Sequence, residues 1–234
     1  GSSNIKVEIN GGVIKNTASD SAINIREGAV VDITGGEIIA PSSNALFVNS
    51  YGVSPQINIS GGTLTGGQWT VYVSQGADVT VSGSASLTTT GNTGAIHLDG
   101  SSYYPSTLLI EGGEIQGDYI AVDADGYSEV TMTGGSITTN RSAALRVSGQ
   151  ATAEISSGTL TGGGTSKTAL SGSEEQITVT GGTFSSNISD YVYEGLSATQ
   201  HADGSYTVTR LETVYVSGSG NDANDGSSAD EAVA

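Results

Sequence analysis

VDITGGEI, at residues 31–38, is the stretch that decides the fold. It places two β-branched residues, Val31 and Ile33, two positions apart, and follows them with a threonine, a glycine pair and a further aliphatic residue at Ile38. β-Branched side chains favour a pleated strand, in which alternate residues face the same side. A glycine pair supplies the backbone freedom that a sharp corner needs. The stretch therefore predicts a strand, a corner and a second short strand.

The same unit recurs along almost the whole chain. Its other copies are VEINGGVI, INISGGTL, VTVSGSASL, LLIEGGEI, VTMTGGSI, AEISSGTL and ITVTGGTF. The positions equivalent to Ile33 lie 22 to 29 residues apart and are Ile9, Ile59, Val81, Ile110, Met132, Ile155 and Val179. This spacing corresponds to one coil of a parallel β-helix and not to a propeller blade of about 40–45 residues.

A second apolar strand lies between consecutive copies of the unit. Its copies are AINI at 22–25, ALFV at 45–48, TVYV at 70–73, AIHL at 95–98, YIAV at 119–122, ALRV at 144–147 and TALS at 168–171. Because side chains alternate across a strand, the tube interior should be lined by Ile23/Ile25, Leu46/Val48, Val71/Val73, Ile96/Leu98, Ile120/Val122 and Leu145/Val147. All three prolines fall in the proposed corners, where a missing N–H does no harm.

These patterns predict an all-β protein, a right-handed parallel β-helix (a solenoid) of about eight coils. We expect the β-helix over residues 1–186, a C-terminal cap over 187–212, and the start of a following module or a linker over 213–234. Within the cap, Ser189 and Asp190 are candidates to cap a short helical turn, and residues 201–204 should join two final strands. A β-sandwich also has short strands and many turns, but it does not require one motif at a constant period.

Composition limits the possible partners. The chain has 234 residues, with 35 Gly, 3 Pro, no Cys and a formal net charge of −17. A negative field of this size repels phosphate backbones and anionic membranes. No apolar run reaches the ~18 residues that a membrane-spanning helix requires, and the lack of cysteine excludes disulfides and thiolate metal sites. We therefore expect neither nucleic-acid binding nor direct membrane insertion.

The repeated unit [V/I]-x-[I/V]-[ST]-G-G-x-[I/L/F], seen at 31–38, 130–137 and 177–184, resembles the pectate-lyase-like β-helix regions of large bacterial cell-surface proteins, especially those of anaerobic Gram-positive bacteria. GGTFSSNISDYV followed by DGSYTVTR is similar to the way such regions end, and VYVSGSGNDANDG is similar to the opening of another such module. The resemblance covers nearly the whole chain, and its motifs specify architecture rather than chemistry. It implies a secreted or cell-wall-attached adhesin or carbohydrate-interacting module, which we expect to be a monomeric part of a longer chain.

Candidate ligand-binding residues gather where the second strand of one coil leads to the first strand of the next. Most of these links are short, but those at 49–56, 99–107 and 123–129 are extended. Adjacent coils stack at about 4.8 Å, so the last two loops should be neighbours. Aromatic rings beside carboxylates suit a sugar, because they offer a face for stacking and acceptors for hydroxyls. We predict that a host or cell-surface glycan would contact Tyr103, Tyr104, Tyr127, Asp99, Asp123 and Asp125, with Tyr51 nearby. Alternatively, the tyrosines only cover an edge of the core.

A second candidate surface is the outward side of the second-strand sheet. By alternation, one residue per coil should project outwards there: Asn24, Phe47, Tyr72, His97, Ala121, Arg146 and Ser171. Of these, Phe47, Tyr72 and His97 should form a flat platform, which Trp69 would extend. Such a platform can bind a glycan, or it can pack beneath a long loop or a neighbouring domain, because an exposed Phe is usually covered or interacting.

The alternative function is a polysaccharide-degrading enzyme, either a glycoside hydrolase or a lyase. A hydrolase needs two carboxylates about 5–9.5 Å apart, which Asp99 with Asp123 or Asp125 would supply from adjacent coils. A lyase would need a basic residue beside a calcium cluster, but none of the seven Lys and Arg falls in the 99–107 or 123–129 loops. The Gly-His-Gly and paired-Asp signatures of β-helix pectinases are also absent. We therefore expect a non-catalytic module, an adhesion stalk or a glycan-binding surface, and assign no catalytic residue.

Calcium is the one cofactor that the sequence leaves open. Asp123, Asp125 and Glu129 offer carboxylates at a spacing that loosely resembles a calcium loop, and residues 221–226 (NDANDG) offer a second such group. Neither has the complete twelve-residue ligand pattern of an EF-hand.

Overall fold

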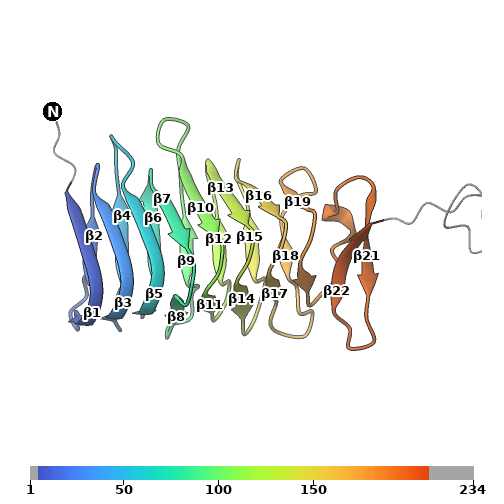
Figure 1. Cartoon of the computed structure of the whole chain (residues 1–234), viewed down its shortest axis with the longest axis horizontal. Helices are drawn as coiled ribbons and strands as arrows, with labels where there is room; N and C mark the ends of the chain where they lie inside the picture. The colour runs from blue at the N-terminus through green and yellow to red at the C-terminus, as the bar shows by residue number, and fades with distance from the viewer. Residues whose placement is uncertain (1–4, 211–234) are drawn as a thin grey trace, which may run out of the picture.

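A computed structural model describes residues 5–210 of the chain. These residues form a parallel β-solenoid of seven complete turns, stacked along one long axis (Figure 1). The fold prediction is therefore confirmed. The module or linker expected over residues 213–234 lies outside the described residues.

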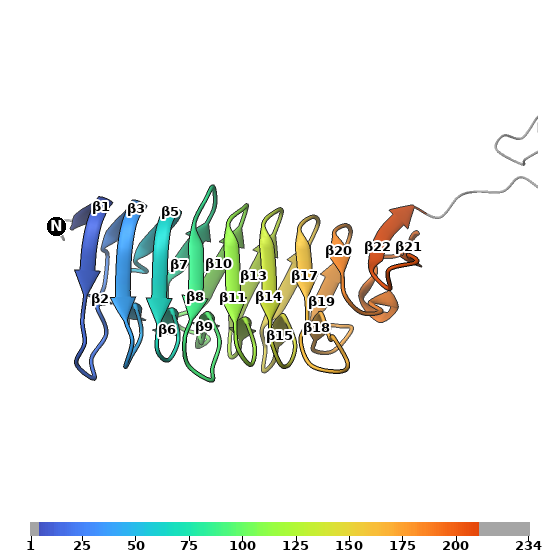
Figure 2. The same cartoon turned by 90° about the horizontal axis from the view of Figure 1, so that it is seen from below.

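Each coil has three faces. In the first coils one long strand covers the first face, turns a corner and continues on the second face; these strands are β1 (Lys6–Lys15), β3 (Val30–Ala40) and β5 (Gln56–Gly66). In later coils that path is divided into pairs: β7 (Asp78–Val81) and β8 (Ser86–Thr89), β10 (Ser106–Ile110) and β11 (Glu114–Gly117), β13 (Ser128–Met132) and β14 (Ser136–Thr139), β16 (Thr152–Ile155) and β17 (Thr159–Thr161), and β19 (Ile177–Val179) and β20 (Thr183–Phe184). Figure 2 shows the second-face strands aligned in a row.

The third face is a separate seven-stranded parallel sheet. Its strands are β2 (Ile23–Ile25), β4 (Leu46–Asn49), β6 (Val71–Gln75), β9 (Ile96–Leu98), β12 (Val122–Ala124), β15 (Leu145–Val147) and β18 (Leu170–Ser171). Within residues 5–210 no third-face strand follows the eighth first-face strand, β19. This explains why the structure has one complete turn fewer than the eight copies of the repeated unit predict.

The corner between the first and second faces requires glycine for two reasons. Gly62 has a φ of +82°, a left-handed conformation that residues with a Cβ rarely adopt. A Cβ on Gly62 would also lie 2.8 Å from the carbonyl oxygen of Gly36, the corner glycine of the coil before. The glycine pair thus lets consecutive corners stack closely enough for the strands on both sides to form parallel ladders.

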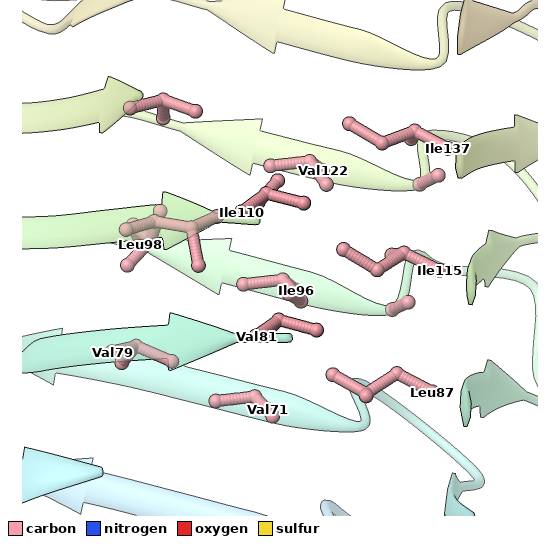
Figure 3. Packing of buried hydrophobic residues seen from close by; sticks show 14 of the residues in the cluster. Val71, Val79, Val81, Leu87, Ile96, Leu98, Ile110, Ile115, Val122 and Ile137 are labelled. Atoms are coloured by element: carbon pink, nitrogen blue, oxygen red, sulfur yellow. The ribbon is translucent and has the colours of Figure 1, made fainter. Parts of the chain in front are cut away.

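The interior of the tube is filled by stacked aliphatic side chains (Figure 3). Ile33 and its seven equivalent residues are all at most 9% exposed, as the repeat predicts. On the third face Leu46, Val71, Ile96 and Leu145 are fully buried, so the predicted alternation holds there as well. Burial of each such side chain contributes roughly 1.5–3 kcal/mol.

One predicted strand is displaced along the chain. The third-face strand expected at 119–122 lies at Val122–Ala124. Val122, and not Ile120, is paired with Leu145 and Ile96. The displacement is two residues, so the inward and outward sets keep their sides, but the outward position of this coil belongs to Asp123 instead of Ala121.

The C-terminal end of the tube is covered by an antiparallel hairpin. A 3₁₀ turn, η1 (Ser189–Tyr191), precedes β21 (Leu196–Gln200) and β22 (Tyr206–Arg210). β22 pairs antiparallel with β20, and the turn at residues 201–204 joins β21 to β22 as predicted. The helical turn is not capped by Ser189 or Asp190; the Asn187 side chain accepts the hydrogen bond from the Ser189 N–H instead.

Candidate ligand-binding surfaces

Two of the extended loops are bonded to each other, as expected. The Tyr127 N–H donates a hydrogen bond to the Gly100 carbonyl oxygen (2.8 Å), and the Ser106 N–H donates one to the Tyr127 carbonyl oxygen (3.2 Å). Gly126, at a φ of +62°, packs against Gly100 and the Asp99 carboxylate so closely that a Cβ would overlap both. The 99–107 loop is the green loop that stands above the row of coils just before β10 in Figure 1. The two loops therefore form one continuous ridge.

Large apolar side chains are exposed along this ridge and its neighbour. Tyr103 is 86% exposed, Tyr51 58% and Tyr127 48%, while Tyr104 is half-buried. The rings of Tyr51 and Tyr104 meet edge to face, with centroids 5.8 Å apart and an interplanar angle of 89°. They meet across the short turn of the coil between them, where the Gly76 N–H donates a hydrogen bond to the Tyr104 carbonyl oxygen (3.2 Å). We call Tyr51, Tyr103, Tyr104 and Tyr127 the tyrosine corner.

The predicted flat platform on the third face has a different arrangement. Phe47 and Tyr72 are stacked with centroids 5.8 Å apart at 13°, and Tyr72 and His97 with centroids 4.8 Å apart at 26°. Rings this close and nearly parallel turn their faces to one another along the solenoid axis, so mainly their edges meet the solvent. Trp69 lies at a tilt against His97. The column is thus chiefly a packing feature, and a sugar could stack only on the outer rings.

The column continues into an ion pair between Asp123 and Arg146. Asp123 was expected in a corner loop beside Asp125, but it lies between His97 and Arg146 in the outward column and is only 3% exposed. Arg146 donates two hydrogen bonds to its carboxylate, and His97 Nδ1 lies 3.3 Å from Asp123 Oδ2. Asp123 is therefore not available to a ligand at the tyrosine corner.

The surroundings of Asp123 favour its charged form. Burial is the largest single influence and opposes ionisation, but the hydrogen bonds from His97 and Arg146, together with the charge of Arg146, outweigh it and lower the pKa of Asp123 below its ordinary value. In turn the Asp123 hydrogen bond raises the pKa of Arg146. Partial burial, and then the charge of Asp99, raise the pKa of Tyr72.

The proposed calcium ligands do not converge. Asp123 is bound by Arg146, Asp125 accepts a hydrogen bond from the Gly126 N–H, and Glu129 lies on β13 of the first face. Within residues 5–210 no group of three or more His, Asp or Glu side chains is placed to hold a metal ion. The prediction of a site at Asp123, Asp125 and Glu129 is therefore wrong in its geometry, and the second candidate, 221–226, lies outside the described residues.

One aromatic side chain beside a carboxylate was missed from the sequence. Tyr193, from the cap, is 59% exposed and lines a shallow hollow of about 250 Å³ on the outer first face, together with Glu154, Thr131, Thr178 and Thr180. The segment reaches this face because the Tyr193 N–H donates a hydrogen bond to the Val179 carbonyl oxygen (2.9 Å). The repeat gives no signal for this contact, since the cap lies outside it.

No family model, no curated protein and no solved structure matches the chain. In the part of the chain that the structure describes, no helix has the length and apolar character needed to cross a membrane.

Proposed function

We propose that the chain is a non-catalytic module of a secreted or wall-attached bacterial surface protein and that it binds carbohydrate at the tyrosine corner. The expected context comes from the resemblance of its repeats to pectate-lyase-like β-helix regions of such proteins. The rigid solenoid would act as a stalk, and the tyrosine corner would provide the contact with a glycan.

The observation that carries this proposal is the concentration of exposed apolar side chains at one corner. Nine large hydrophobic residues are exposed among the described residues, and four of them, Tyr51, Val53, Tyr103 and Tyr127, are in the extended loops of this corner. Exposed aromatic side chains that cluster, instead of being scattered singly, mark an interaction surface. Tyrosine suits a sugar because its ring stacks on C–H groups and its hydroxyl forms hydrogen bonds.

Acidic groups next to the corner favour a neutral sugar over an acidic one. Asp125 is exposed and Asp99 is half-buried beside it, so both offer acceptors to sugar hydroxyls. With the net charge of −17, these carboxylates would repel a uronic or sialic acid. Each stacking contact or hydrogen bond contributes only about 1 kcal/mol, so a single site binds weakly and adhesion depends on several modules acting together.

A glycan array screened with a multivalent display of the chain tests the proposal. Tyr103→Ala should abolish binding of any neutral glycan found, with an unchanged thermal transition, because this ring is almost fully exposed and contributes little to folding. Tyr51→Ala should weaken binding and also slightly lower the melting temperature, because its ring contacts Tyr104.

The matched control is Tyr119→Ala. Tyr119 is 51% exposed but lies outside the extended loops, so its loss should leave glycan binding intact. If Tyr103→Ala binds like the parent chain, or if no glycan is retained at all, carbohydrate binding at this corner is refuted. Release of reducing sugar ends from a retained glycan would instead favour the enzyme hypothesis, for which Asp99 and Asp125 are the remaining carboxylate pair.

A further inference from the structure

The last part of the first face differs from the rest because the cap adds a tyrosine to it. After β20 the chain returns to this face, where Val192 forms a parallel bridge with Val179. The hydrogen bond from the Tyr193 N–H to the Val179 carbonyl oxygen (2.9 Å) supports this register. Val192 and Tyr193 therefore take the place of a further first-face strand, beside the hairpin at the end of the solenoid (Figure 1).

Strand alternation places the Tyr193 side chain outside the tube. Val179 is fully buried, so the neighbouring Thr178 and Thr180 point outwards. Val192 is aligned with Val179, and Tyr193 therefore follows Thr180 in one outward column of the face. The coil before contributes the small Ser156 to the same column, as its pairing places it. This step from small side chains to an exposed ring accounts for the hollow of about 250 Å³ that these residues line.

One carboxylate lines the same hollow. Glu154 lies on β16, paired with Thr131 of β13 on one side and with Thr178 of β19 on the other. Neighbouring strands are about 4.8 Å apart, so a threonine hydroxyl flanks the carboxylate in each direction. Glu154 is exposed, and within residues 5–210 no ion pair joins it to a cationic side chain. Its charge is therefore accessible to a ligand.

The electrostatic surroundings of this carboxylate favour a cation. None of the residues that line the hollow is basic. Exposed Glu129 lies on the neighbouring strand β13, and exposed Glu194 directly follows Tyr193. Together with the net charge of −17, these groups attract a positively charged ligand and repel an anionic one.

The remaining groups of the hollow suit a sugar ring. Its volume is below the range of about 300–1,000 Å³ for pockets that bind drug-sized ligands, so it suits about one ring. The hydroxyls of Thr131, Thr178 and Thr180 can each donate and accept hydrogen bonds. The Tyr193 ring offers a face that stacks on C–H groups and also attracts a nearby cation. A sugar with a free amino group uses all of these features, whereas a neutral sugar leaves the charge of Glu154 without an opposite charge.

We propose that this hollow, formed by Thr131, Glu154, Thr178, Thr180 and Tyr193 and called the cap hollow below, binds an amino sugar whose amino group is not acetylated. The ammonium group pairs with the Glu154 carboxylate, the sugar ring stacks on Tyr193, and the threonine hydroxyls bind the sugar hydroxyls. The cap hollow shares no residue with the tyrosine corner and does not rest on the proposed function. The chain would thus carry two sites of different selectivity.

NMR titration of the full ¹⁵N-labelled chain tests the proposal. The probes are the β-1,4-linked tetramers of glucosamine, of N-acetylglucosamine and of glucose. The glucosamine tetramer should shift the amide signals of Thr180 and Tyr193. It should bind at least about tenfold more tightly than the other two, because only its amino groups are charged at neutral pH and hydrogen bonds between charged groups are the stronger ones. Added salt should weaken this binding.

Two variants and their matched controls locate the site. Glu154→Gln should weaken binding of the glucosamine tetramer about tenfold, because it removes the charge that pairs with the ammonium group. Glu114→Gln, at an exposed position on the second face, makes the same change in net charge and should have little effect. Tyr193→Ala should weaken binding several-fold, and Tyr193→Phe should restore most of it because the ring is kept. Tyr119→Ala, at 51% exposure close to the 59% of Tyr193, should bind like the parent chain.

Several outcomes overturn the proposal. Absence of binding refutes it, and equal affinity for the acetylated tetramer refutes recognition of an ammonium group. Equal losses in Glu154→Gln and Glu114→Gln would show only general attraction of a cationic polymer to an acidic chain. If Tyr193→Ala disturbs the cap, Glu154→Gln still decides, because its exposed side chain lies on a regular strand.

The two carbohydrate sites can fail separately. Tyr103→Ala, which should abolish neutral-glycan binding at the tyrosine corner, should leave the glucosamine tetramer bound. Glu154→Gln should leave binding of a neutral glycan at the tyrosine corner unchanged.

Discussion

Arg146 binds the Asp123 carboxylate of the preceding coil with two hydrogen bonds, Nε to Oδ1 at 2.7 Å and Nη2 to Oδ2 at 2.6 Å. The guanidinium is partly exposed, but the Asp123 side chain is only 4% exposed. His97, from the coil before, lies against the same carboxylate. One buried charge thus connects three consecutive coils through side chains, in addition to the ladder of backbone hydrogen bonds.

Removal of Arg146 should cost more stability than removal of the charge on Asp123. Arg146→Met keeps an apolar stem over the carboxylate but leaves the buried Asp123 charge with His97 as its remaining partner. We expect this variant to lose about 2 kcal/mol of unfolding free energy. The loss should be smaller than for a fully buried pair because Arg146 is partly exposed. Asp123→Asn should cost about 1 kcal/mol. Urea unfolding of both variants and of the double variant measures this; losses that simply add would contradict the pairing.

Stability should fall in acid partly because of Asp123. Its pKa is lowered in the folded protein, so its contribution is complete above the unfolded value near 3.8 and is lost as the pH falls through the lower folded value. The pKa of Asp118 is also lowered, chiefly by its hydrogen bond with Arg141, so protonation of Asp118 in acid should reduce stability as well. Asp123→Asn should therefore show a smaller loss of unfolding free energy than the parent chain below about pH 4. Parallel slopes for the two proteins would show that Asp123 is not involved.

The architecture could be predicted because the repeat encodes it redundantly. Corner glycines and alternating aliphatic residues recur in every coil, so an error in one copy does not change the fold. The position of Asp123 could not be predicted from apolar alternation, since YIAV at 119–122 is more apolar than AVDA at 121–124. An additional signal was present: an alanine precedes the strand in nearly every coil, as in Ala45, Ala95 and Ala144, and Ala121 continues that series.

Surface arrangements were less predictable for a physical reason. The period of the sequence repeat specifies which residues share a column on the surface of the solenoid. The orientation of an aromatic ring in that column depends on the side chains next to it. Phe47, Tyr72 and His97 were correctly assigned to one column, yet they gain more contact by stacking on each other than by lying flat on the sheet. Similarly, the adjacency of the 99–107 and 123–129 loops follows from coil stacking, whereas the contact of Tyr104 with Tyr51 depends on the short turn at Gly76.

The displaced strand also predicts which interior residue matters most. Leu145 is fully buried in the core cluster, whereas Ile120 is 4% exposed and lies in the turn before β12. Leu145→Ala should cost about 3 kcal/mol, within the usual range for a buried leucine. Ile120→Ala should cost clearly less, because a turn can relax around the missing atoms. Thermal and urea unfolding of the two variants tests this. An equal or larger loss of unfolding free energy for Ile120→Ala would instead support the strand predicted at 119–122.

Two corner glycines allow backbone strain to be separated from crowding. Gly12 and Gly62 have nearly the same φ, +80° and +82°, so alanine at either position adopts the same unfavourable left-handed conformation, at a cost of roughly 1–2 kcal/mol. At Gly12 a Cβ would meet nothing within 4 Å, whereas at Gly62 it would press on the backbone of Gly35 and Gly36. Gly62→Ala should therefore lower the free energy of unfolding, measured by urea unfolding, by more than Gly12→Ala does. The difference between the two variants is the contribution of close stacking between corners. If the two losses are equal, glycine is required at these corners only for its φ, and the coils have room to move apart.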